Sequence, residues 1–252
     1  QFSLPTEELS KRTKNNHLEL YKGYIDAFNK ISAELDGANT SDSNSNHSQF
    51  RSLKIDEVYN LNAIYLHELY FANISDLNSE ITMDSLSFMK LERDFGTFDE
   101  WQRNFIACSQ ASRCGWVVTG YNMFTRTYMN YVIDLHSLNV PIGVYPVIVM
   151  DVWQHSYYPD YLKDVKGYTI NMMKQLNWDV IEKRFEKAED LPLTALQMAL
   201  DQIDNDPENQ NRIKVQIPAL NDVGDGIWAR LTHFYTGENN GIFFIPETGT
   251  QV

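Results

Sequence analysis

Apolar residues recur at the spacing of an α-helix through most of the first 114 positions. This pattern predicts four helices, over residues 7–35, 55–74, 86–95 and 98–114. The polar tract DGANTSDSNSNHSQ at 36–49 predicts a loop between the first two helices. Gly96 separates the last two, and Thr97 followed by Glu100 matches the capping box that begins a helix.

The pattern changes after residue 114. Three segments rich in Val, Ile, Tyr and Thr predict strands, over residues 116–119, 127–136 and 144–149. Residues 156–187 return to helical spacing. A run of helices followed by a run of strands indicates an α+β fold. We therefore expect an N-terminal helical hairpin, then a small three-stranded antiparallel sheet with flanking helices, and a C-terminal extension.

The extension covers residues 188–252, after a hairpin region at 1–85 and an α/β region at 86–187. A short helix is predicted near 193–204, followed by extended chain with several Gly, Pro, Asn and Asp turns. Apolar segments such as IFFIP are too hydrophobic for a solvated linker. We expect 188–252 to be an extended arm that lies partly against a partner chain.

Composition narrows the class of partner. The formal net charge is −13 and the pI is about 4.8, so nucleic acid is an unfavourable partner. No apolar run approaches the ~20 residues of a membrane span. Cys108 and Cys114 are expected to be buried free thiols, which favours an intracellular location, either the cytoplasm or an organelle matrix. A place in a virion is the alternative. The start at Gln1 is consistent with a targeting segment removed ahead of it.

Candidate chemistry lies at the end of the last predicted strand, where Asp151 is followed four positions later by His155. A carboxylate and an imidazole suit iron, manganese and zinc. The same pair also fits an Asp that caps a helix and a histidine satisfied in the core. His17, His67 and His136 are equally ambiguous when each is taken alone.

Five separated segments together resemble the iron/manganese superoxide dismutase family, in the family's order and with its spacing over residues 2–187. DVWQHSYYPDY at 151–161 resembles D-V-W-E-H-A-Y-Y-x-D-Y, and LHELYF at 66–71 resembles N-H-x-x-F/Y-W. DFGTFDEW at 94–101, Gly115-Trp116 and Leu176-Asn177-Trp178 resemble further family segments. Since these matches are widely spaced, chance agreement is a poor explanation for them.

The resemblance implies one iron or manganese ion and superoxide as the substrate. The implied metal ligands are His17, His67, Asp151 and His155, and placing His17 requires a one-residue contraction before Tyr24. Tyr24 matches the tyrosine that gates substrate entry, with Tyr21 as the alternative. His136 lies where the family has an outer-sphere Gln or His. Trp116 and Trp153 match the aromatic wall.

The departures from the family pattern concern the dimer interface. Gln154 stands where the family has a Glu that reaches a ligand His of the partner subunit, and Tyr21 replaces one of its paired histidines. Tyr158 matches an interface tyrosine. A homodimer is therefore expected to have a weaker bridge. This keeps open a second hypothesis, that the chain is a dismutase-fold structural subunit of a larger assembly, such as a virion or an organellar complex, joined through 188–252.

Overall fold

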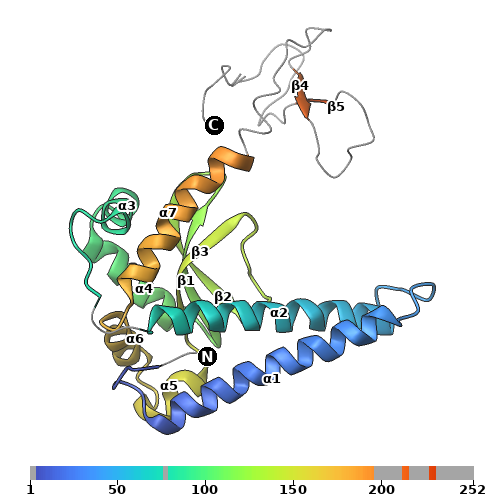
Figure 1. Ribbon diagram of the computed structural model, residues 1–252, viewed down its shortest axis with the longest axis horizontal. Coiled ribbons are helices and arrows are strands. Elements are labelled where there is room, and N and C mark those ends of the chain that lie inside the picture. The colour runs from blue at the N-terminus through green and yellow to red at the C-terminus, as the bar shows by residue number, and fades with distance from the viewer. Residues whose placement is uncertain (1–3, 76–78, 196–211, 216–226, 231–252) are drawn as a thin grey trace. The chain divides into compact units, whose positions relative to one another are not determined.

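The computed structural model describes residues 4–75, 79–195, 212–215 and 227–230 (Figure 1). The chain divides into two compact units, residues 1–188 and 189–252. The first unit contains every residue for which the sequence suggests chemistry.

A helical hairpin opens the first unit. Helix α1 (Lys11–Asp36) lies beside helix α2 (Gln49–Asn73), and residues 37–48 connect them at the far end (Figure 1). The side chains of Ser10 and Ser48 cap the two helices by accepting hydrogen bonds from Thr13 N and Arg51 N, each at 3.2 Å. Because Ser48 provides this cap, α2 begins six residues before its predicted start.

Two shorter helices follow, α3 (Leu86–Phe95) and α4 (Phe98–Ala111). Gly96 ends α3 at φ 89°, a left-handed conformation that favours glycine. The Thr97 hydroxyl accepts a hydrogen bond from Glu100 N at 3.1 Å, as the capping-box pattern predicts. The break at Gly96 therefore turns the chain between two separately capped helices.

The sheet contains β1 (Gly115–Asn122), β2 (Thr127–Asp134) and β3 (Val144–Asp151). All pairings are antiparallel, in the order β2-β1-β3, which confirms the predicted α+β fold. Gly115 is required at the start of β1, because a Cβ atom there would lie 2.0 Å from the carbonyl oxygen of Ile133. This close approach pairs β1 with the end of β2.

The predicted return to helix over 156–187 is confirmed, and this region is divided into separate helices. The chain forms α5 (Gln154–Tyr161), α6 (Val165–Met173) and α7 (Trp178–Ala195). Leu162 ends α5 with φ 54°, and Asp164 caps α6 by accepting a hydrogen bond from Gly167 N at 2.9 Å. Asn177 does the same for Val180 N at 3.2 Å. These short polar side chains favour caps over helix interiors, which explains the breaks.

The core lies between the sheet and the helices that pack on it. α2 packs against β3, while α4 contacts β1, β2 and α6. The largest fully buried side chains are Trp101, Trp116, Tyr70, Tyr121, Tyr128, Tyr168, Phe71, Phe105, Phe185, Ile74, Leu91 and Ile148. The packing of α2 on β3 brings the hairpin to the end of the sheet.

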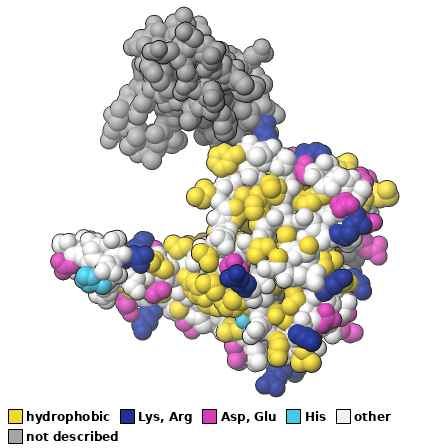
Figure 2. All heavy atoms as spheres, turned by 180° about the vertical axis from the view of Figure 1, so that it is seen from behind, with side chains coloured by type: hydrophobic (Ala, Val, Ile, Leu, Met, Phe, Trp, Pro, Cys, Tyr) yellow, Lys and Arg dark blue, Asp and Glu magenta, His cyan; other side chains and the backbone are white. Residues whose placement is uncertain are grey.

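Several large apolar side chains remain exposed. In the loop between β2 and β3, Leu138, Val140 and Ile142 are 53%, 42% and 90% exposed. Figure 2 shows hydrophobic side chains gathered on the surface where the hairpin joins the rest of the first unit. Cys108, in α4, and Cys114, just before β1, are free as expected, but both are only half-buried. None of the described helices has the length and hydropathy needed to cross a membrane.

The second unit contains a two-stranded antiparallel pair, β4 (Arg212–Val215) and β5 (Ile227–Arg230). The predicted helix near 193–204 lies mostly outside the described residues, and so does the IFFIP segment. The extended-arm prediction for 188–252 stays a prediction.

Candidate metal centre

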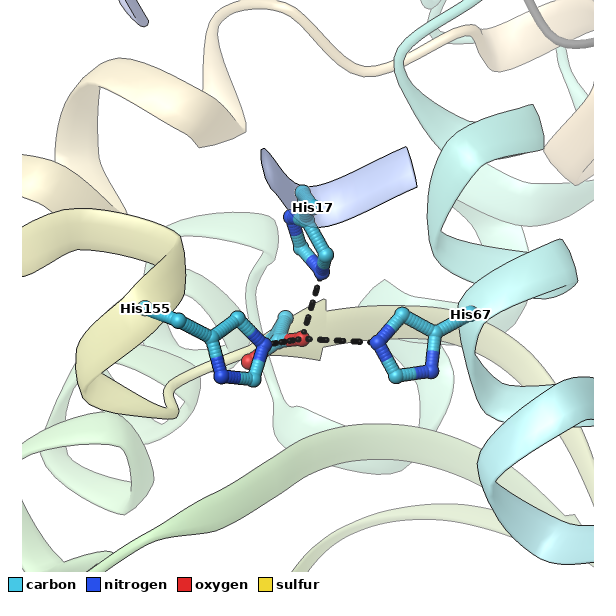
Figure 3. Close-up of side chains that lie close together, drawn as sticks. His17, His67 and His155 are labelled. Atoms are coloured by element: carbon cyan, nitrogen blue, oxygen red, sulfur yellow. Dashed lines mark hydrogen bonds and ion pairs between the residues drawn. The ribbon is translucent and has the colours of Figure 1, made fainter. Parts of the chain in front are cut away.

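Four side chains from distant parts of the sequence meet at one place. His17 comes from α1, His67 from α2, Asp151 from the last position of β3 and His155 from the first turn of α5. Figure 3 shows the three imidazole rings pointing toward one another. The candidate ligand atoms of all four residues lie within 4.8 Å of one another, and only His155 is not fully buried.

The carboxylate of Asp151 is the centre of the cluster. Its Oδ2 atom lies 3.0 Å from His17 Nε2, 3.3 Å from His155 Nε2 and 3.8 Å from His67 Nε2. Each histidine therefore presents the same ring nitrogen to one oxygen. The convergence of three imidazoles on one carboxylate fits a mononuclear site for a first-row transition metal.

The hydrogen bond of His67 fixes which of its ring nitrogens faces the carboxylate. Its Nδ1 atom lies 2.6 Å from the carbonyl oxygen of Ala63, so Nδ1–H donates and Nε2 presents a lone pair to the carboxylate. The Nε2 atoms of His67 and His155 are buried without a hydrogen-bond partner. A lone pair and a carboxylate oxygen repel each other at short range, and a cation between them removes that repulsion.

The charge states suit metal binding at neutral pH. Burial lowers the pKa of His67 to about 3, so its imidazole is neutral. Burial alone would raise the pKa of Asp151, but the charge of His155 and the contacts with His155 and His17 hold it well below its ordinary value. His67 thus offers a neutral imidazole and Asp151 an ionised carboxylate, which are forms that bind metals.

Further hydrogen bonds fix the orientation of Asp151. Trp153 N donates to its Oδ1 atom at 2.8 Å. The backbone carbonyl of Asp151 accepts hydrogen bonds from Ser156 Oγ at 3.0 Å and from Tyr168 Oη at 2.8 Å. Tyr168 Oη also lies 3.0 Å from Tyr70 Oη. These partners hold the carboxylate in place, in the way that outer hydrogen bonds hold metal ligands in other sites.

This chain is similar to several known superoxide dismutases. The chain is 34% identical over 186 residues to the iron superoxide dismutase of Aquifex pyrophilus, covering 72% of this chain and 86% of the relative. The chain belongs to the iron/manganese superoxide dismutase family. It is also 28% identical over 185 residues to a manganese/iron enzyme of Aeropyrum pernix, covering 72% of this chain and 83% of that one. It is 27% identical over 174 residues to a manganese superoxide dismutase of Halobacterium salinarum, covering 69% of this chain and 84% of that one.

Two family models match separate parts of the chain. Residues 85–184 match the C-terminal domain of iron/manganese superoxide dismutases. Residues 201–252 match a model described as the type VI secretion system/phage-baseplate injector OB domain. The dismutase match lies within the first compact unit and the second match lies within the second unit.

The residues that the sequence predicted around the metal ligands lie next to the cluster in the structure. The Trp116 ring lies 4.9 Å from that of His67, and the Trp153 ring lies 6.0 Å from that of His155. His136 Nε2 lies 3.0 Å from Tyr24 Oη, and Trp116 Nε1 donates to His136 Nδ1 at 3.0 Å. The functional roles that the resemblance implies for these four residues stay predictions.

The two candidates for the gating tyrosine occupy different surroundings. Tyr24 stacks obliquely near His67, with ring centroids 5.4 Å apart, and contacts His136. Tyr21 instead donates a hydrogen bond to Glu68 at 2.7 Å. The geometry therefore favours Tyr24 as the residue beside the metal centre.

The predicted interface residues lie on or near the surface of the single chain. Gln154 and Tyr158 are exposed on α5, and Tyr21 is half-buried against Glu68. Since a single chain is described, their contribution to a dimer stays a prediction.

Sequence reasoning missed Tyr59, which lies beside His136, and Arg184, which joins α2 to β3. Tyr59 lies eight positions before His67 on α2, and its ring is 4.7 Å from that of His136. That spacing corresponds to about two helical turns and could have placed it near the centre. Arg184 is buried in α7 and bonds to both α2 and β3. Its position within a helical pattern resembles that of an ordinary surface arginine, so the sequence held no comparable signal.

Proposed function

We propose that this chain is a superoxide dismutase that holds one iron or manganese ion with His17, His67, Asp151 and His155. The observation that carries the proposal is the convergence of three imidazole Nε2 atoms on one buried carboxylate oxygen. Membership of the dismutase family supports the same reading. Three neutral imidazoles and one carboxylate give a net ligand charge of minus one, which suits both divalent and trivalent metal.

The chemistry divides between the ion and the protein. When bound, the ion supplies the change of oxidation state that takes an electron from one superoxide and gives it to another. Two superoxide ions and two protons then give one dioxygen and one hydrogen peroxide. The chain excludes bulk water with Trp116 and Trp153, and it holds hydrogen-bonding protons beside the centre on His136 Nε2 and Tyr24 Oη.

The proposal is tested on purified protein reconstituted separately with iron and with manganese. We expect one ion per chain and dismutation of superoxide with at least one of the two metals. His136→Ala should keep the ion and lower the rate per ion about tenfold, because it removes the partner of Tyr24 and Trp116 but no ligand. His47→Ala, at an exposed loop histidine, is the matched control. Absence of bound metal, or metal without dismutation, would contradict the function.

A second proposal concerns assembly, and the match of residues 201–252 to an injector OB domain favours it. We propose that 188–252 attaches the dismutase unit to a larger particle, whether in a virion or an organellar complex. The exposed side chains of Leu138, Val140 and Ile142 offer additional apolar contact surface. In this arrangement the first unit either retains catalysis at the particle or serves as a scaffold.

Removing the second unit separates the two proposals. A chain that ends at Ala195, the last residue of α7, should keep its metal and its dismutation rate, because the metal centre lies wholly within the first unit. The same chain should no longer sediment with the particle. A homodimer formed through α5 would persist after the truncation, and light scattering measures its mass. Loss of metal on truncation, or unchanged sedimentation, would contradict the attachment role.

A further inference from the structure

A hydrogen-bond chain with a fixed direction leads away from the metal centre. Trp116 Nε1 lies 3.0 Å from His136 Nδ1, and His136 Nε2 lies 3.0 Å from Tyr24 Oη. An indole nitrogen can only donate, so His136 Nδ1 must accept. A neutral imidazole then carries its single proton on Nε2 and donates it to Tyr24. Trp116 therefore fixes the tautomer of His136.

This tautomer limits what His136 can do. Its one N–H is used by Tyr24 and its one lone pair by Trp116, so neither remains for a molecule in the pocket. Protonation would place a second N–H against the Trp116 donor. Burial also lowers the pKa of His136 to about 4, which keeps the ring neutral at physiological pH. His136 consequently acts on the centre through Tyr24.

Tyr24 accepts from His136, and its own O–H must turn elsewhere. Tyr59 is the neighbouring phenol, with ring centroids 6.4 Å from Tyr24 and 4.7 Å from His136. Burial raises the pKa of Tyr24 to about 12, and hydrogen bonding with Tyr59 adds to the rise. Burial also raises the pKa of Tyr59. Because Tyr24 Oη already accepts from His136 Nε2, its own proton is left for the neighbouring Tyr59 hydroxyl, with Tyr24 as the donor and Tyr59 as the acceptor.

We propose that Tyr59 is a positioning residue whose hydroxyl accepts the proton of Tyr24 and so turns it away from the metal pocket. The proposal deepens the dismutase function and rests on it. The complete chain runs from Trp116 to His136, Tyr24 and Tyr59. Tyr24 then presents only a lone pair to an anion in the pocket. Without the Tyr59 hydroxyl, the Tyr24 proton can turn inward and donate to that anion.

The hydrogen-bond direction is tested first in the metal-free protein, which makes this arm independent of the dismutase function. Nitrogen-15 NMR should show His136 protonated on Nε2. The hydroxyl proton of Tyr24 should give a nuclear Overhauser effect to the ring of Tyr59. Protonation on Nδ1, or an effect to the ring of His67 in place of Tyr59, overturns the proposal.

The consequence is tested by azide binding to the metal-loaded protein, since azide is a small anion like superoxide. Tyr59→Phe keeps the ring and should tighten azide binding about fivefold, the value of one neutral hydrogen bond. Tyr65→Phe, at an exposed tyrosine on the same helix, should change nothing. In a Tyr24→Phe background, Tyr59→Phe should also have no effect. Equal tightening in both backgrounds, or none in either, shows that Tyr59 does not act through Tyr24.

Discussion

Replacing Asp151 with Asn is expected to yield a folded protein that no longer retains iron or manganese. The amide has the same shape, and its oxygen can still accept the hydrogen bond from Trp153 N. The bonds from Ser156 and Tyr168 go to the backbone carbonyl of residue 151 and are unaffected. The centre loses its only carboxylate, and metal affinity should fall about a hundredfold or more, since even outer-shell changes cost about 10–100-fold.

The measurement is metal content per chain after dialysis, together with far-ultraviolet circular dichroism to establish folding. Asp160→Asn is the matched control. Asp160 lies on the next helix, is exposed, and accepts a hydrogen bond from Ser10 N at 2.9 Å, outside the metal centre. It should leave metal content unchanged. Wild-type metal retention by Asp151→Asn would show that the carboxylate is not a ligand.

The sequence predicted the order and type of the elements through residue 155 because each has a strong local signal. Thr97 and Gly96 identified the break between α3 and α4, and apolar runs identified the three strands. The missed helix boundaries lie where a polar side chain caps a helix. Ser48, Asp164 and Asn177 each did so. Periodicity alone cannot show which Ser, Asp or Asn leaves its helix to bond the backbone.

The candidate ligands could be named from the sequence only through their resemblance to a family. Periodicity placed His17 and His67 on helices, but a histidine on a helix is equally consistent with a core position. Their meeting depends on how α1 and α2 pack together and on how α2 packs against β3, and these contacts are long-range. The lone pair of His67 toward Asp151 is likewise a tertiary feature, since the carbonyl of Ala63 determines it.

The donor-to-acceptor direction of the hydrogen bonds from Trp116 to Tyr59 also could not be predicted from the sequence, because it depends on tertiary contacts. His136 was expected to lie within hydrogen-bond reach of metal-bound solvent or of Tyr24, but only its partners in the fold decide which ring nitrogen carries the proton. Tyr59 resembles any tyrosine in an amphipathic helix. Only its distance to His136 and Tyr24 gives it a role.

The second large effect is expected at Arg184, which joins the two elements that carry His67 and Asp151. Its guanidinium donates to the carbonyl oxygens of Val147 in β3 and Leu69 in α2, each at 3.1 Å. It also donates to the side chain of Asn73, whose amide donates in turn to the carbonyl of Val149 at 2.8 Å. Burial lowers the pKa of Arg184 to about 10, yet it remains charged at neutral pH.

Arg184→Met should lower the free energy of unfolding of the first unit by about 3 kcal/mol. Methionine fills most of the volume, but three buried oxygen acceptors lose their donor, at about 1–3 kcal/mol each. Methionine is neutral, so the variant no longer has the desolvation cost of a buried charge, and this offsets part of that loss. The free energy of unfolding of Arg184→Lys should lie between those of the wild type and Arg184→Met. An ammonium keeps the charge but cannot reproduce the planar guanidinium and its several donors. Urea denaturation of the metal-free protein measures these differences.

Arg103→Met is the matched control, because this arginine is exposed on α4 and pairs at the surface with Glu100. Its effect should stay within about 0.5 kcal/mol. Arg184→Met should also weaken metal binding, because α2 and β3 lose the bonds that set their spacing, while Arg103→Met should not. If Arg184→Met matches the wild type in both stability and metal affinity, the packing of α2 on β3 alone holds the centre in place, and the buried arginine is dispensable to it.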